Sequence, residues 1–181
     1  MLRSVVRRIL KKRSGRGASD LDYWLALYSA SPRALRKLAR VRALIAHREV
    51  VPKEAAFAAQ LVGALTENCG PCTQIHVNMA RSAGVDDAQI EAVLKADFAA
   101  MSADTALAYR FASAIVLRAA DQGPAREAVR AAWGEKGVID LTFAMQASRI
   151  FPMIKAGLGF AAECRQVMLG SRSVNGVRRP A

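Results

Sequence analysis

Residues 67–76 read Glu-Asn-Cys-Gly-Pro-Cys-Thr-Gln-Ile-His, and they mark the start of a predicted helix. Asn68 is the expected N-cap, because its side-chain oxygen can accept a hydrogen bond from the first turn. Pro71 is compatible with a first turn, whose N–H groups have no intrahelical partner. Gly84 is the expected C-terminal stop. An Ala-rich segment from Pro52 to Leu65 predicts a helix that leads directly into this stretch.

Cys69, Cys72 and His76 share one face of the predicted helix, because positions i, i+3 and i+7 coincide when each residue turns by about 100°. Both thiols lie at the positive end of the helix dipole, which favours the thiolate form. The imidazole one turn after Cys72 can exchange a proton near neutral pH. This face therefore offers a nucleophile, a second thiol that can close a disulfide, and a base.

Other interpretations of the two cysteines are open. Free cysteines are often small buried hydrophobes. A structural zinc site takes four ligands, and the remaining cysteine and histidine, Cys164 and His47, stand alone in the sequence. A c-type haem site needs His directly after the second Cys, where this chain has Thr73. Cys-Gly-Pro-Cys also occurs in thioredoxins, but that fold requires a preceding strand, and here a helix is predicted. We expect no metal and no cofactor.

The pattern Asn-Cys-x-x-Cys-x-x-x-His, followed by a helix and Gly84, resembles the carboxymuconolactone decarboxylase-like family. It is most similar to the alkylhydroperoxidase D branch, whose members have both cysteines. The resemblance extends over residues 52–94 and implies an all-α, oligomeric antioxidant enzyme that cycles between dithiol and disulfide. Its substrate would be a hydroperoxide or the disulfide of a partner peroxiredoxin, with an unknown electron donor. Cys69 and Cys72 would be the redox pair, and His76 would relay protons.

The family's relay glutamate has no direct counterpart, because Phe57 stands at the corresponding position. Glu54, one turn earlier on a similar face, and Glu67, directly before the motif, are the candidate replacements. Glu54 also has a simpler explanation, since a carboxylate in the first turn of a helix is stabilised by the dipole. Which glutamate serves, if either does, stays open. The attacking cysteine is also open: the family favours Cys72, whereas thioredoxin-like chemistry favours Cys69.

Composition sets the outline of the chain. The 181 residues are 52% hydrophobic and rich in Ala, which predicts one all-α domain of about seven or eight helices over residues 20–170. Residues 1–19 form a basic arm that we expect to be mobile, and residues 171–181 are expected to be a disordered tail. Much of the net charge of +12 lies in these ends. An odd number of cysteines indicates a reducing compartment, such as the cytoplasm.

The remaining helices follow from periodicity and from capping residues. We expect an aromatic helix over residues 20–30 and a helix over 32–47, with His47 interacting with the dipole at its end. Further helices are expected at 86–94, 102–120 and 124–133, and a long helical stretch at 138–169, which Pro152 should kink or split. No strand is expected. No apolar run reaches the roughly 18 residues of a membrane span.

Two functions of other kinds remain as alternatives. Residues 1–19 could contact an anionic membrane surface as an amphipathic helix, or nucleic acid, and the protein would then be a non-catalytic helical module. Other branches of the family suggest a cofactor-free decarboxylase or lactone-processing enzyme. The paired cysteines argue against this last function, because the decarboxylase members generally do not use such a dithiol.

Overall fold

The computed structural model describes residues 18–160, 167–175, 177, 178 and 180. Within them the chain forms eight helices and one small hairpin, so the all-α prediction is confirmed. The helices are α2 (Ala18–Ala30), α3 (Pro32–Ala39), α4 (Val41–Ala46), α5 (Lys53–Thr66), α6 (Gly70–Ser82), α7 (Asp87–Lys95), α8 (Ala103–Val116) and α9 (Gln122–Gly157). None of these helices combines the length and the apolarity needed to cross a membrane. The basic arm up to residue 17, and Cys164, lie outside the described residues.

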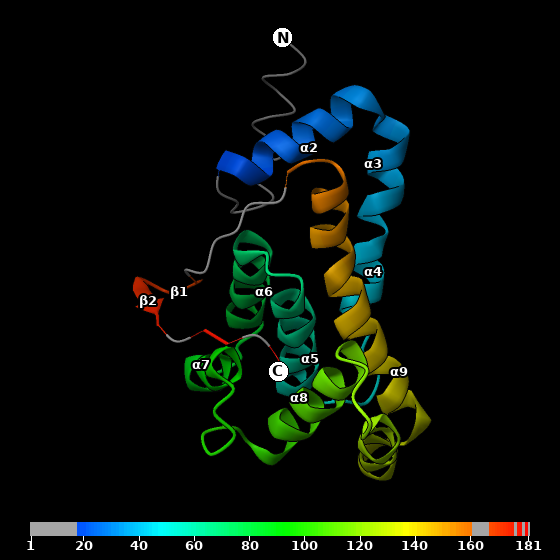
Figure 1. Ribbon diagram of the computed structural model, residues 1–181, viewed down its shortest axis with the longest axis vertical. Coiled ribbons are helices and arrows are strands. Elements are labelled where there is room, and N and C mark those ends of the chain that lie inside the picture. Colours follow the sequence, from blue (N-terminus) through cyan, green and yellow to red (C-terminus); the bar gives the residue numbers. More distant parts are fainter. Residues whose placement is uncertain (1–17, 161–166, 176, 179, 181) are drawn as a thin grey trace.

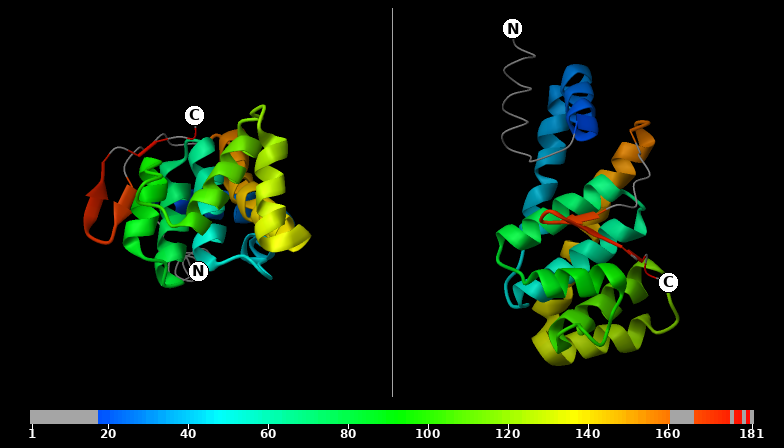
Figure 2. Two further views of the ribbon diagram at one scale, coloured as in Figure 1. Left: turned by 90° about the horizontal axis from the view of Figure 1, so that it is seen from below. Right: turned by 90° about the vertical axis from the view of Figure 1, so that its left-hand side faces the viewer.

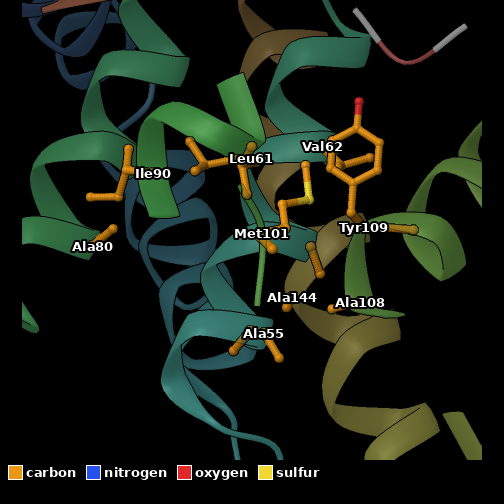
Figure 3. Close-up of a cluster of buried hydrophobic side chains, with 14 of the residues drawn as sticks. Ala55, Leu61, Val62, Ala80, Ile90, Met101, Ala108, Tyr109 and Ala144 are labelled. Atoms are coloured by element: carbon orange, nitrogen blue, oxygen red, sulfur yellow. The ribbon is translucent and has the colours of Figure 1, made fainter. Parts of the chain in front are cut away.

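Helix α5 is the centre of the main core, and it packs against α6, α8 and α9 (Figure 1). Its segment from residue 55 to residue 65 is buried except at Phe57, which is partly buried. Figure 3 shows Leu61 and Val62 of α5 among side chains of other elements, including Met101 and Tyr109. At Gly63, an added Cβ would lie 2.3 Å from the Met145 carbonyl oxygen. The α5 and α9 backbones therefore meet at this glycine.

A second, smaller core lies beneath α2. Tyr23 and Trp24 of α2 pack with Leu38 of α3 and with Phe151 of α9. The ring centroids of Tyr23 and Trp24 are 5.1 Å apart in an edge-on arrangement. Figure 1 shows α2 lying across the end of α9, away from α7 and α8. The aromatic helix expected over residues 20–30 is therefore present, and its aromatic side chains pack in this second core.

Local signals placed most helix ends correctly. The side chains of Asp86 and Ser102 cap α7 and α8 by accepting hydrogen bonds from backbone N–H groups of the first turn. Gly84, with a φ of 74°, follows the end of α6 as expected. The expected break after Trp133 occurs at Gly134, whose φ of 68° interrupts the helical dihedral angles of α9.

The helices differ from expectation in three places. The helix predicted over residues 32–47 is two helices, α3 and α4, which meet at Arg40. Of the two effects expected at Pro152, a kink or a split, the split does not occur, because α9 continues to Gly157 with Pro152 buried. The long stretch does not stay helical to Leu169, because β1 (Val167–Leu169) pairs there with β2 (Arg172–Val174) in an antiparallel hairpin.

The hairpin lies against the outer side of α6 and α7 (Figures 1 and 2). The side-chain amide of Gln74 exchanges two hydrogen bonds with the backbone of Met168, at 2.6 and 2.8 Å. The Arg172 guanidinium contacts the Glu91 carboxylate at 2.5 Å and, with Lys95, lowers the pKa of Glu91 to about 2. Val174 is buried. The expectation of a disordered tail from residue 171 is therefore wrong for β2, because partners distant in sequence hold this segment.

Candidate active site

The turn between α5 and α6 places the two cysteines. Asn68 has a φ of 52°, a left-handed conformation that Asn tolerates better than most residues. Cys69, and not Asn68 as expected, is the N-cap of α6, and its sulfur accepts a hydrogen bond from the N–H of Cys72 at 3.4 Å. Asn68 makes the turn that aims Cys69 at the open end of the helix, so the capping prediction missed by one residue.

Cys69 and Cys72 form a disulfide, with their Cα atoms 5.2 Å apart. Both side chains are buried, with 7% and 3% of their surface exposed. The sulfur of Cys69 faces the unpaired N–H groups of the first turn of α6, which stabilise a thiolate when the pair is reduced. The expected proximity of the two sulfur atoms is confirmed.

His76 lies one turn after Cys72 on α6, and its ring contacts the neighbouring helix α5. Nδ1 of His76 is 3.1 Å from Oε1 of Gln60. The Gln60 Nε2 group donates to the carbonyl oxygen of Ile45 at 3.2 Å, which orients the amide oxygen of Gln60 towards His76. The Nδ1 atom of His76 therefore carries the proton that Gln60 accepts, and Nε2 is left unprotonated.

Burial of the His76 ring lowers its pKa from 6.5 to about 4. The cause is desolvation, which penalises the charged imidazolium form. The ring is consequently neutral near pH 7, and Nε2 is available as a proton acceptor. His76 and Cys72 occupy positions i and i−4 of one helix, whose Cβ atoms are typically about 5–6 Å apart.

Glu54 is not brought to the cysteines. It occupies the first turn of α5, about 18 Å along the helix from Thr66, where the turn to Cys69 begins. Its carboxylate is 3.8 Å from the ammonium group of Lys53, which itself donates to the carbonyl oxygen of Gly84 at the far end of α6. The geometry favours the simple role of Glu54 as a first-turn carboxylate.

Glu67 lies beside the site but is engaged elsewhere. It is the C-cap residue of α5, and its carboxylate pairs with the Arg149 guanidinium of α9 at 2.6 Å. Both side chains are largely buried, with 20% and 23% exposed. This ion pair attaches the turn that carries Cys69 to α9, so Glu67 positions the turn.

A pocket of about 830 Å³ opens beside this site. Cys72 and His76 form part of its wall, whereas Cys69, Gln60 and Glu67 are not among its lining residues. The remainder of the wall comes mainly from α2, α4, α6 and the end of α9. A molecule in the pocket would therefore meet Cys72 before Cys69.

No protein-family model, curated protein or solved structure matches this chain. Among the described residues, no group of three or more His, Cys, Asp and Glu side chains is arranged to hold a metal ion.

His47 belongs to a different cluster. Its Nε2 atom is 3.5 Å from the buried carboxylate of Asp140, which accepts hydrogen bonds from the backbone N–H groups of residues 49–51. His47 is also the C-cap residue of α4, in agreement with its expected place at a helix end.

Sequence reasoning missed Gln60, the residue that orients His76. The signal was present: Gln60 is the only polar residue between Ala55 and Leu65, and its side chain is 4% exposed. A buried amide in an apolar helix requires a partner. The sequence does not say which of the surrounding helices supplies it.

Proposed function

We propose that the protein is a thiol–disulfide oxidoreductase of the antioxidant type, related to the alkylhydroperoxidase D branch of the carboxymuconolactone decarboxylase-like family. The observation that carries the proposal is that three features meet at the N-terminal end of α6. These are a Cys69–Cys72 pair at bonding distance, a neutral His76 with Nε2 available, and a pocket whose wall contains Cys72. The cysteine pair supplies two electrons, His76 transfers the proton, and the pocket lets a substrate reach the sulfur of Cys72.

The reaction with a hydroperoxide starts from the reduced pair. Nε2 of His76 accepts the proton of the Cys72 thiol, and the thiolate sulfur attacks the terminal peroxide oxygen. The O–O bond breaks, an S–O bond forms, and the departing alkoxide takes the proton from His76 to leave as an alcohol. Cys72 is now a sulfenic acid. The Cys69 thiol gives up its proton as its sulfur attacks that of Cys72, the S–O bond breaks, and the departing hydroxide takes that proton and leaves as water, so that the Cys69–Cys72 disulfide forms.

A protein disulfide, such as that of a partner peroxiredoxin, can be reduced by the same groups. The Cys72 thiolate would attack one sulfur of the partner disulfide and form a mixed disulfide. Cys69 would then attack Cys72 and release the reduced partner. In both reactions two electrons leave the dithiol, so a reducing dithiol must restore the pair in each cycle.

Assignment of the attack to Cys72 follows from the pocket. Cys72 lines the pocket and lies one turn from His76, whereas Cys69 is the N-cap of α6 and is not among the residues that line the pocket. His76 takes part as the proton carrier, and Gln60 acts as a positioning residue that holds the tautomer. No carboxylate relay is included, because Glu54 lies at the other end of α5 and Glu67 is paired with Arg149.

The assembly that we propose is a homo-oligomer. Large apolar side chains remain exposed along α9 of the single chain: Ile139 at 45%, Phe143 at 39% and Met153 at 54%. Contact between copies would remove this surface from water. A dithiol that must be reduced in each cycle suits a reducing compartment such as the cytoplasm.

The test is a thiol count in a Cys164→Ser background, which leaves only Cys69 and Cys72 to react. The fully reduced protein receives one equivalent of cumene hydroperoxide, and free thiols are counted by mass spectrometry over time. Rapid loss of both thiols, slowed at least tenfold by His76→Gln, is the expected result. If the thiols resist the hydroperoxide but are oxidised to the Cys69–Cys72 disulfide by a small-molecule disulfide, the protein would be a disulfide reductase and not a peroxidase. Thiols inert to both reagents would overturn the proposal.

A further inference from the structure

Helix α3 and the residue that joins it to α4 present a face whose charged side chains are all basic. Positions i, i+3, i+4 and i+7 of a helix lie on one face. Four exposed side chains have this spacing and form what we call the basic face: Arg33, Arg36, Lys37 and Arg40. Arg40 has helical dihedral angles, and the exposed side chain of Leu44 follows it one turn later on α4. The face extends for about 10 Å along the helix axis, and the sequence has no Asp or Glu between Asp22 and Glu49 to balance it.

Folding accounts for only part of the basic face. The helix dipole favours Arg36 and Lys37 in the last turn of α3, but it disfavours Arg33, a cation in the first turn. Arg33 and Lys37 are also like charges one turn apart, which repel each other. No side chain of the basic face has an ion pair or a hydrogen bond within the described parts of the chain, whereas several other exposed cations are paired, as Arg81 is with Asp87. An anionic partner would offset the repulsion within the face.

Charge and composition indicate which anionic partner fits. A second copy of the chain does not suit the basic face with its own, because cations would meet cations. No aromatic or amide side chain, of the kinds that stack on nucleic-acid bases or read them, occurs between residues 32 and 46. Residues 1–17 add seven Arg and Lys residues, no acid, and five Leu, Ile and Val residues. Basic residues mixed with apolar ones are typical of segments that bind the interface of an anionic membrane.

We propose that the basic face docks the protein on an anionic phospholipid membrane surface. The guanidinium and ammonium groups of α3 meet the phosphate and carboxylate groups of the lipids. The side chain of Leu44, which is 42% exposed, reaches the boundary of the acyl chains. This inference concerns where the protein is held, and it does not rest on the proposed redox function.

Cosedimentation at physiological salt measures binding of the protein to phosphatidylcholine vesicles with and without phosphatidylserine. The expected result is binding only when phosphatidylserine is present. The triple variant Arg33→Gln, Arg36→Gln, Lys37→Gln should lower the binding constant by about thirtyfold or more, because each cation near an anionic surface contributes to binding.

The matched control removes the same charge from the surroundings of α8 and the start of α9, which lie at the other end of the molecule from α3 (Figure 1). It is the triple variant Arg110→Gln, Arg118→Gln, Arg126→Gln. Its binding constant should change by less than about threefold, because salt screens charges far from the membrane. Thermal unfolding checks that both triple variants fold.

Equal losses in the two triple variants would show that only net charge matters, and they would overturn the inference. Binding that is the same with and without phosphatidylserine would also overturn it. A DNA duplex is titrated at the same salt concentration as a further comparison. DNA binding that depends on the basic face, together with vesicle binding that does not, would overturn the membrane contact in favour of nucleic acid. No hydroperoxide enters these measurements, so their failure would leave the redox function to its own thiol count.

Discussion

The side-chain amide of Gln60 determines which nitrogen of His76 carries a proton. Its oxygen lies 3.1 Å from Nδ1 of His76, and its nitrogen donates to the carbonyl oxygen of Ile45, so the amide orientation is set by two partners. Three helical segments, α4, α5 and α6, thereby contribute to the state of one imidazole ring. A base with a defined tautomer is what the proposed proton transfer from Cys72 requires.

Replacing Gln60 tests this arrangement. Gln60→Leu removes the acceptor and leaves the Nδ1–H group of His76 buried without a partner, which should lower the free energy of unfolding by about 1–3 kcal/mol. The tautomer would also no longer be held, so peroxide-driven thiol loss should slow and its pH dependence should change. Urea denaturation and stopped-flow thiol assays measure the two effects. Gln60→Glu keeps an acceptor oxygen and should hold the tautomer. An unchanged pH profile in Gln60→Leu would contradict the positioning role.

The depressed pKa of His76 predicts a loss of stability in mild acid. Its pKa is about 4 in the folded protein against the ordinary histidine value of 6.5 in the unfolded chain, so between these two pH values the unfolded chain binds the proton more readily. The free energy of unfolding should therefore fall as the pH drops from 6.5 to 4, by up to about 3 kcal/mol from this residue. The measurement is urea denaturation at pH 7 and pH 4.5. His76→Gln should show a smaller loss over the same range, and an equal loss would place the acid sensitivity elsewhere.

The two single-cysteine variants distinguish attacking from resolving thiol. In a Cys164→Ser background, Cys69→Ser should consume one equivalent of hydroperoxide and leave a sulfenic acid at Cys72, because only Cys72 lines the pocket. Cys72→Ser should react at least tenfold more slowly. Dimedone labelling followed by mass spectrometry locates the sulfenic acid. A fast Cys72→Ser protein labelled at Cys69 would reverse the assignment.

Close contact between α5 and α9 makes Gly63 sensitive to any side chain. A Cβ there would lie 2.3 Å from both the Met145 carbonyl oxygen and the Ser148 hydroxyl, so Gly63→Ala must separate the helices. We expect a loss of about 1–3 kcal/mol in the free energy of unfolding, the usual range for overpacking. Gly123→Ala in α9 is the matched control, since nothing lies within 4 Å of its added Cβ. Similar free energies of unfolding for the two variants would contradict a close contact between α5 and α9 at Gly63.

The buried carboxylate of Asp140 should be one of the most sensitive positions outside the site. Its Oδ2 atom accepts hydrogen bonds from the backbone N–H groups of Glu49, Val50 and Val51, with N–O distances of 2.9 to 3.2 Å. Asp140→Ala leaves these donors without their acceptor, so the expected loss is about 3 kcal/mol or more. Asp104→Ala, which removes an exposed first-turn carboxylate of α8, should cost less than about 1 kcal/mol. Thermal unfolding of both variants measures the difference, and equal effects would contradict the role of Asp140.

Local chemistry explains which parts of the fold were predictable. Asp86, Ser102 and Gly84 end or begin helices through contacts within a few residues, and the sequence alone was sufficient for them. The spacing of Cys69, Cys72 and His76 follows from helix periodicity in the same way. Asn68 shows the limit of such reasoning, because Asn suits a cap and a left-handed turn equally, and the approach of α5 selects the turn.

Tertiary structure decided the rest. The helical class, most helix ends and the shared helix face of Cys69, Cys72 and His76 could be predicted from the sequence, because these depend on interactions within about one or two turns. Only the packing of α5 against α6 and α4 brought Gln60 to His76. Contacts with Gln74 of α6 and Glu91 of α7 hold residues 167–174 as a hairpin. These contacts join residues distant along the chain. Their free energy depends on burial and on partners that no local pattern specifies.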